Sequence, residues 1–169
     1  IAVWEDGNKS RISEYQLEKV TPTASVTKTN APGLSCMYYE GAWDKIPDFS
    51  KEKPVRTVTS GKIDLSPSRG KEFDFGMVFK GYLNVPASAV YKIYVSSDDG
   101  GRLILDGEQV IDYDGIHGMG EKHVVLALEE GFHPIEFHYF QHLGGKGIEI
   151  SWESNDIAKE EISEKFFGR

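Results

Sequence analysis

The stretch that decides the fold runs from Tyr91 to Gly115 and reads YKIYVSSDDGGRLILDGEQVIDYDG. At its start, Tyr91, Ile93 and Val95 alternate with more polar residues, which is the period-two pattern of a half-buried strand. Further on, an Asp-Gly pair at 106–107 suits the positive φ angles of a two-residue hairpin turn, so two strands are expected to fold back there. The stretch therefore predicts consecutive antiparallel strands.

The same kind of pattern continues on both sides of this stretch. In GIEISWE, residues 147–153, Ile148, Ile150 and Trp152 share one face of an extended chain. Such runs recur roughly every 8–12 residues between turn-forming residues, which predicts an all-β fold, an antiparallel β-sandwich or flattened barrel. Only residues 157–167 have a pattern compatible with a helix, with the two phenylalanines at its end expected on the edge of the sandwich.

The sequence divides into three predicted segments. Residues 1–20 resemble two strands around a turn, as in the C-terminal hairpin of an upstream β-domain. Residues 21–32, TPTASVTKTNAP, lack periodic hydrophobic residues and have the composition of a linker. Residues 33–169 carry the sandwich pattern. Because the chain opens within a strand-like run, we expect it to be a C-terminal piece of a larger protein.

Composition excludes several classes of partner. The chain has 169 residues, enough for its own core, and a net charge of −8, which disfavours binding to nucleic acid. No apolar run approaches the ~20 residues of a membrane-spanning helix, so no membrane insertion is expected. The single cysteine, Cys36, lies in an apolar run and is expected to be a buried thiol without a disulfide partner.

Several segments taken together resemble the PA-fourteen family, a β-sandwich module named after a fragment of anthrax protective antigen. They are GLSCMYYEGAW (33–43), FGMVFKGYLNVP (75–86), the stretch quoted first, HPIEFHYFQ (133–141) and GIEISWE (147–153). The resemblance covers residues 33–169. It implies a β-sandwich or flattened barrel that serves as an accessory module in bacterial glycosidases, yeast adhesins and toxins, with carbohydrate binding as its usual role.

Residues 1–20 resemble the last hairpin of the small β-domain that follows the catalytic barrel in bacterial β-hexosaminidases. This resemblance implies a secreted or periplasmic glycosidase as the parent, with its catalytic domain upstream in the same chain, and so an extracytoplasmic location. The chain itself carries no Gly-x-Ser-x-Gly elbow, phosphate loop or dinucleotide fingerprint. We therefore expect no catalysis by this chain alone.

Asp98 and Asp99 allow two interpretations. Neighbouring side chains on a regular strand point to opposite faces. The resemblance implies that calcium-dependent family members join such a pair by a cis peptide, so that both carboxylates reach one calcium ion and sugar hydroxyls complete its ~6–8 oxygen ligands. Calcium is then the candidate cofactor, although the late loop at 142–147 lacks the asparagine of those members and carries Lys146 instead. Alternatively, the two aspartates accept backbone N–H bonds and organise a turn.

Three further residues are candidate sugar contacts. Tyr113 and His117 lie in IDYDGIHGMGEKH, residues 111–123, and His142 begins the late loop. An aromatic or imidazole face can pack on a pyranose ring while carboxylates accept its hydroxyl hydrogens. The alternative for the first two is an ordinary surface loop, and for His142 a structural histidine. An EF-hand is excluded, because position 123 is histidine where the bidentate glutamate is needed, and the histidine spacing does not suggest zinc.

Three functions fit these observations. The first is a carbohydrate-binding module whose partner is a glycan or oligosaccharide. The second is a structural module whose loops shape the active site of the neighbouring catalytic domain without binding sugar alone. The third is an adhesin-type interaction domain.

Overall fold

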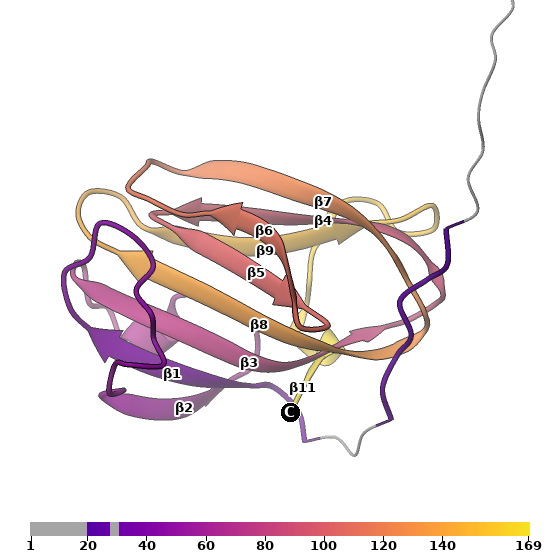
Figure 1. The fold of residues 1–169 in the computed structure, drawn as a ribbon, viewed down its shortest axis with the longest axis horizontal. Coiled ribbons are helices and arrows are strands. Elements are labelled where there is room, and N and C mark those ends of the chain that lie inside the picture. The colour runs from indigo at the N-terminus through magenta and orange to yellow at the C-terminus, as the bar shows by residue number, and fades with distance from the viewer. Residues whose placement is uncertain (1–19, 28–30) are drawn as a thin grey trace, which may run out of the picture.

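The fold is a sandwich of two antiparallel sheets, seen in a computed structural model that describes residues 20–27 and 31–169 (Figure 1). One sheet has the order β2 (Arg56–Ser60), β1 (Leu34–Glu40), β3 (Phe75–Val85), β8 (Gly131–Gln141), β5 (Gly101–Leu105) and β6 (Glu108–Tyr113), with β11 (Phe167–Gly168) paired to β3. The other has the order β10 (Glu160–Glu161), β9 (Gly147–Glu153), β4 (Ala89–Asp98) and β7 (Gly120–Leu128). The predicted all-β, antiparallel sandwich is confirmed, whereas the hairpin predicted for residues 1–20 lies outside the described residues.

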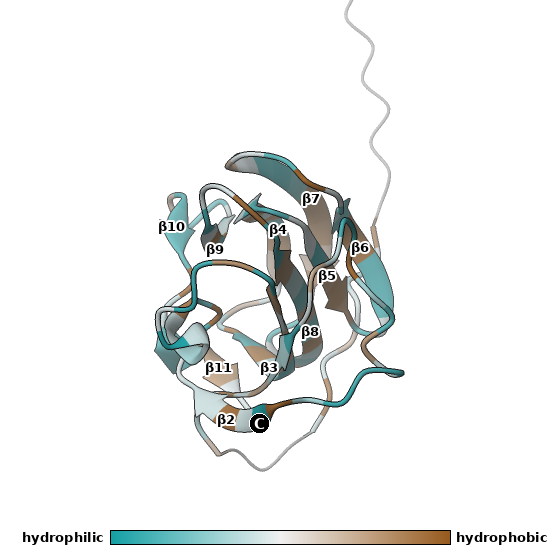
Figure 2. Cartoon of the chain, turned by 90° about the vertical axis from the view of Figure 1, so that its left-hand side faces the viewer, coloured by the Kyte–Doolittle hydropathy of each residue, from teal (hydrophilic) through white to brown (hydrophobic). Residues whose placement is uncertain are grey.

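The core lies between the two sheets and is built from the alternating residues of each strand. Tyr91, Ile93 and Val95 of β4 are all buried, as the period-two pattern predicts, and Trp152 of β9 joins them. Phe137 of β8 is among the residues that face them from the larger sheet. Burying side chains of this size contributes roughly 1.5–3 kcal/mol each. Seen from the side, the hydrophobic stretches follow the strands, while the edge strand β10 is hydrophilic (Figure 2).

The Asp-Gly pair forms the predicted hairpin. Asp106 and Gly107 have φ angles of 53° and 83°, and they connect β5 to β6 where Leu105 pairs with Glu108. Both residues therefore adopt the left-handed conformation that a two-residue turn of this type requires. The Asp106 carboxylate also accepts a hydrogen bond from the buried ring of His133, whose Nδ1 lies 2.9 Å from Asp106 Oδ2.

The C-terminal segment differs from its predicted helical pattern. Residues 157–167 contain only the short strand β10 and a single 3-10 turn, Glu164–Phe166, before β11 begins. Phe167 is buried and pairs with Leu83 of β3, while the ring of Phe166 packs edge-on against Trp152 at 4.7 Å. The phenylalanines do dock on the sandwich, but pairing with β3 outweighs the local helical preference, as tertiary context commonly does.

Part of the segment predicted to be a linker is bonded to the sandwich. The backbone N–H of Thr23 donates to Ala127, and that of Val26 donates to Phe132 at 2.8 Å. Ala31 exchanges two backbone hydrogen bonds with Arg169. The domain boundaries predicted at residues 20 and 32 stay predictions, and these contacts show that residues 20–27 run along the domain.

Candidate functional site

Three connections between strands meet at one end of the sandwich, and Asp99 holds them together. Its Oδ1 accepts the backbone N–H of His117 at 3.1 Å, and its Oδ2 accepts that of His142 at 2.8 Å. The residue is 1% exposed, and the peptide bond that joins it to Asp98 is cis. Asp99 therefore organises the neighbouring turns, as one interpretation of the sequence expects, while the cis bond is the feature named in the other. We call residues 98–101, 114–119 and 142–146 together the loop end.

Asp98 differs from its neighbour because its carboxylate is less fully engaged. It is 9% exposed, and its Oδ2 lies so close to Gly145 that a Cβ added there would be 2.6 Å away. Burial, and then the charge of Asp99, raise the pKa of Asp98, while the backbone N–H of Met119 opposes that rise. Glycine at 145 therefore leaves room for the Asp98 carboxylate.

Tyr113 and His117 form a stacked pair at the start of the loop after β6. Their ring centroids are 3.8 Å apart with an interplanar angle of 16°. The imidazole Nδ1 lies 3.0 Å from the carbonyl oxygen of Gly118, and Nε2 lies 3.1 Å from that of Tyr113. Since both ring nitrogens are engaged by backbone groups, His117 shapes its own loop and offers a ligand its ring rather than a hydrogen-bonding atom.

The late loop is fixed to the segment that precedes β3. The imidazole Nδ1 of His142 lies 2.8 Å from Asp74 Oδ1. The ammonium of Lys146 donates to Glu72 at 2.7 Å and to the carbonyl oxygen of Lys71 at 3.0 Å. His142 therefore has a structural partner, and the cation of Lys146 is held by an acidic side chain outside the Asp98–Asp99 pair.

Two buried residues of β8 support the loop end and were not predicted. The Tyr139 hydroxyl lies 2.5 Å from the carbonyl oxygen of Asp98 and 2.8 Å from Gln141 Oε1, and burial raises the pKa of Tyr139 so that the hydroxyl stays protonated. The Gln141 amide donates to the carbonyls of Leu143 and Gly145. A signal was present in the sequence, since the alternation in HPIEFHYFQ puts a glutamine at a core-facing position, where a buried polar group needs partners.

Asp114 is a further residue that the sequence reasoning missed as a site residue. Its Oδ1 accepts the backbone N–H of Ile46 at 2.7 Å and that of Gly115 at 2.8 Å. Its Oδ2 lies 3.4 Å from the Arg102 guanidinium. This carboxylate joins the loop after β6 to β5 and to the long connection between β1 and β2.

The residues around Asp98 and Asp99 fit a calcium ion poorly. Calcium gathers ~6–8 oxygen ligands. Here both Asp99 oxygens accept backbone N–H groups, and the carbonyls of Leu143 and Gly145 accept the Gln141 amide. Within residues 20–27 and 31–169, no cluster of three or more His, Cys, Asp or Glu side chains could hold a metal. The Asp98 carboxylate and the second lone pairs of these engaged oxygens would be the ligands left for such an ion.

The fold is a two-layer antiparallel sandwich with three loops that converge at one end. A model of the PA14 domain matches residues 30–165, and the chain belongs to the PA14 domain family. Among residues 20–27 and 31–169, no helix is long and apolar enough to span a bilayer.

The chain is similar to proteins with different contexts. It is 27% identical over 139 residues to the anti-sigma-I factor RsgI3 of Acetivibrio thermocellus, covering 82% of this chain and 21% of that protein. A solved anti-sigma factor domain-containing protein is 25% identical, with a TM-score of 0.70, covering 81% of this chain and 48% of that one. The PA14 sugar-binding domain from an RTX adhesin is 19% identical, with a TM-score of 0.69, covering 82% and 98%. The chain thus spans about a fifth of the curated relative and about half of the first solved one.

Proposed function

We propose that this chain is a non-catalytic carbohydrate-binding module of a larger, extracytoplasmic protein, and that the loop end is its sugar-binding surface. Membership of the PA14 family supports the class of function. The observation that carries the site is the meeting of Asp98, the stacked Tyr113–His117 pair and the His142 loop at one end of the sandwich, all linked through Asp99.

The chemistry of the loop end suits a sugar. The carboxylate of Asp98 accepts hydrogen bonds from hydroxyl groups, and charged acceptors form the stronger bonds of this kind. Two exposed apolar side chains lie on the adjoining loops, Met119 and Leu143, each 57% exposed. Such side chains can cover the C–H faces of a pyranose ring while the carboxylate fixes its orientation. A weak site suffices, because tethering to a parent protein raises the local concentration of its ligand.

The parent of this module has two candidates. A β-hexosaminidase-like glycosidase rests on the resemblance of residues 1–20, which lie outside the described residues. The anti-sigma factor relatives favour a regulatory parent instead. In such a parent, glycan binding by this module would control the anti-sigma factor, rather than bring a glycosidase to its substrate. We propose the regulatory parent first, because the similarity to these relatives covers more than four fifths of the chain.

Glycan-array binding by the 169-residue chain, followed by titration of the strongest ligand, tests the proposal. We expect Asp98→Asn to weaken binding at least about 10-fold, the equivalent of a charged hydrogen bond, while Glu149→Gln on the exposed outer face of β9 leaves it unchanged. Binding of no glycan, together with an altered chain-length preference when the module is deleted from a glycosidase parent, would favour the structural-module alternative. If the role is that of an adhesin, the chain should bind cell-surface glycans on the array.

A further inference from the structure

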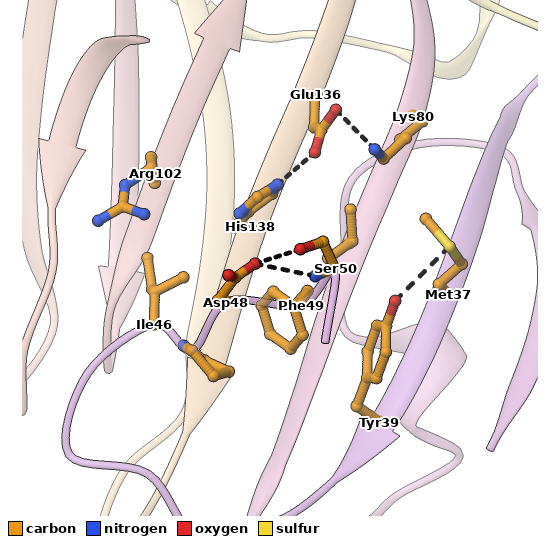
Figure 3. Close-up of a pocket in the computed structure, with 12 residues that line it drawn as sticks. Met37, Tyr39, Ile46, Asp48, Phe49, Ser50, Lys80, Arg102, Glu136 and His138 are labelled. Atoms are coloured by element: carbon orange, nitrogen blue, oxygen red, sulfur yellow. Dashed lines mark hydrogen bonds and ion pairs between the residues drawn. The ribbon is translucent and has the colours of Figure 1, made fainter. Parts of the chain in front are cut away.

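A hollow of about 470 Å³ lies on the outer face of the larger sheet, away from the core (Figure 3). Its floor is made by outward-facing residues of β1, β3, β8 and β5, and one side is formed by residues 46–50 of the connection between β1 and β2. Phe49 of that connection is buried against Tyr39 and lies edge-on to His138, with ring centroids 5.6 Å apart. The hollow is therefore a formed part of the fold, separate from the loop end.

A second hollow of about 380 Å³ continues the first along the same face, and the two share Lys80 and Glu136. Strand register explains the continuity, because Val78 pairs with His138, Lys80 with Glu136, and Tyr82 with Pro134. Along β3 and along β8, the residues of these three pairs alternate with core residues of the same strand, so all of them face outward. From Val78 to Tyr82 the floor spans roughly 13 Å at ~3.3 Å per residue. We call these two hollows together the outer-face groove.

Hydrogen-bonding groups of both kinds are concentrated in the middle of the groove. The Glu136 carboxylate accepts Lys80 at 2.9 Å and also contacts the His138 ring (Figure 3). Within the described residues, the buried Nδ1 of His138 has no hydrogen-bond partner. Asp48, at the side of the groove, accepts the Ser50 hydroxyl at 2.6 Å.

The charged side chains of the first hollow balance one another and are largely paired, and Arg169 adds a cation in the second. Lys80 and Arg102 face Glu136 and Asp48, and each of the four forms an ion pair with a protein group. A charged ligand would have to compete with these pairs, whereas hydroxyl groups can use the acceptor and donor positions that each ion pair leaves open. Pro134, which lines the second hollow, suits the C–H face of a sugar ring.

The position of the groove also argues against an extended peptide. β3 and β8 are central strands whose backbone groups pair with neighbours on both sides. A peptide therefore cannot add to them as a further strand, which is how sheets commonly recognise extended chains. Recognition here must come from side chains.

We propose that the outer-face groove is a second binding site, for an extended and uncharged oligosaccharide chain, and that it acts separately from the loop end. Its length accommodates more than one sugar ring, and its largely paired charges beside an apolar side chain match a neutral polyhydroxylated ligand. The site rests on the sheet register and on the side chains of the groove, so it stands or falls independently of the sugar-binding surface proposed above.

Nuclear magnetic resonance of the uniformly labelled 169-residue chain tests this proposal. Cellohexaose, xylohexaose, mannohexaose and chitohexaose are titrated in parallel with their monosaccharides. We expect one or more hexaoses to shift the backbone amides of residues 78–82, 102–104 and 135–138, with affinity at least about 10-fold above that of the monosaccharide. No shift of these amides with any of the four hexaoses overturns the groove. Shifts confined to residues 98–99, 113–117 and 142–145 also overturn it, while leaving the proposed function standing.

Two single substitutions provide the second test. Lys80 is half exposed, so Lys80→Ala is expected to fold, and Glu136→Gln keeps the shape of the side chain. Each should weaken hexaose binding at least about 5-fold without moving the shifts at the loop end, whereas Glu149→Gln on the other sheet should change neither. Unchanged hexaose affinity in both groove variants would overturn the assignment.

Discussion

Replacing Asp99 by asparagine should destabilise this domain, whereas replacing its neighbour Asp98 by asparagine should stabilise it at pH 7. In Asp99→Asn, one carboxylate oxygen becomes an NH₂ group that faces a backbone N–H, of either His117 or His142. In Asp98→Asn, a buried charge is removed while an oxygen remains to accept the N–H of Met119. Both changes preserve side-chain shape, so the difference between them reports hydrogen bonding and charge rather than packing.

The expected loss for Asp99→Asn follows from its contacts. The residue is 1% exposed, so the unpaired N–H and the new NH₂ cannot turn to water. Losing a charge-assisted bond and leaving a buried donor unsatisfied costs about 1–3 kcal/mol. For a domain of this size, each kcal/mol lowers the melting temperature by roughly 2–4 °C, so a fall of roughly 2–12 °C is expected.

The expected gain for Asp98→Asn depends on pH. Because the pKa of Asp98 is raised in the folded state, the folded protein binds its proton more tightly than the unfolded chain does. The free energy of unfolding therefore decreases as pH rises from the unfolded value of ~3.9 through the raised pKa. Asp98→Asn should be more stable than the parent sequence at pH 7, and this advantage should shrink as the pH approaches 4.

Urea denaturation followed by tryptophan fluorescence, at pH 7 and pH 4.5 in the presence of EDTA, measures both effects. A linear extrapolation with unchanged slope gives the change in the free energy of unfolding for each variant. If Asp99→Asn were neutral, the two backbone contacts to that carboxylate would not support the loop end. If Asp98→Asn were destabilising at pH 7 and no less so at pH 4.5, the account of its raised pKa would be wrong.

Three further predictions concern the same region and the core. Addition of 5 mM CaCl₂ to EDTA-treated protein should leave the melting temperature unchanged. A calcium site would instead stabilise the folded state by ~2.7 kcal/mol at a calcium concentration 100 times its dissociation constant. A clear rise in melting temperature would therefore contradict the poor fit of calcium to these ligands. Gly145→Ala should destabilise the domain and make the late loop more susceptible to protease, because the new methyl group would lie 2.6 Å from Asp98 Oδ2. Gly118→Ala is the matched control, because a methyl group there has nothing within 4 Å. Equal effects of the two substitutions would count against the contact. Burial raises the pKa of the Cys36 thiol to about 12, so native protein at pH 8 should not react with a thiol reagent until denaturant is added, and rapid labelling of the native state would refute this.

Much of the fold follows from local pattern in the sequence. The period-two alternation of β4 and β9 and the Asp-Gly turn each specify their own geometry, and the structure bears them out. The C-terminal segment does not follow from its local pattern, because β11 is defined by pairing with β3, which lies far away in the sequence. A strand of two residues has too little periodicity to reveal itself.

The residues of the loop end could be predicted from the sequence, but the hydrogen bonds that connect them could not. Asp98, Asp99, Tyr113, His117 and His142 do come together, yet their binding role stays a prediction. The sequence pattern does not distinguish the two aspartates. In the structure, Asp99 accepts two backbone N–H groups, whereas Asp98 lies beside Gly145. These differences depend on which connections meet in space, which only the sheet order determines.

The outer-face groove could not be predicted from the sequence. Its floor combines two or three outward-facing residues from each of four strands, and no single strand reveals the hollow by its own pattern. The register between β3 and β8 places Lys80 beside Glu136, and the connection between β1 and β2 supplies the side wall.

The contacts of Asp114 have a consequence for how the two proposed surfaces are held in place. This one carboxylate binds the backbone of Ile46, beside the groove wall, and that of Gly115, in the loop after β6, and it also lies near Arg102 on the groove floor. Because a single carboxylate holds all three groups, it fixes the wall and floor of the groove and the loop after β6 in one rigid arrangement, and its loss would displace parts of both surfaces at once.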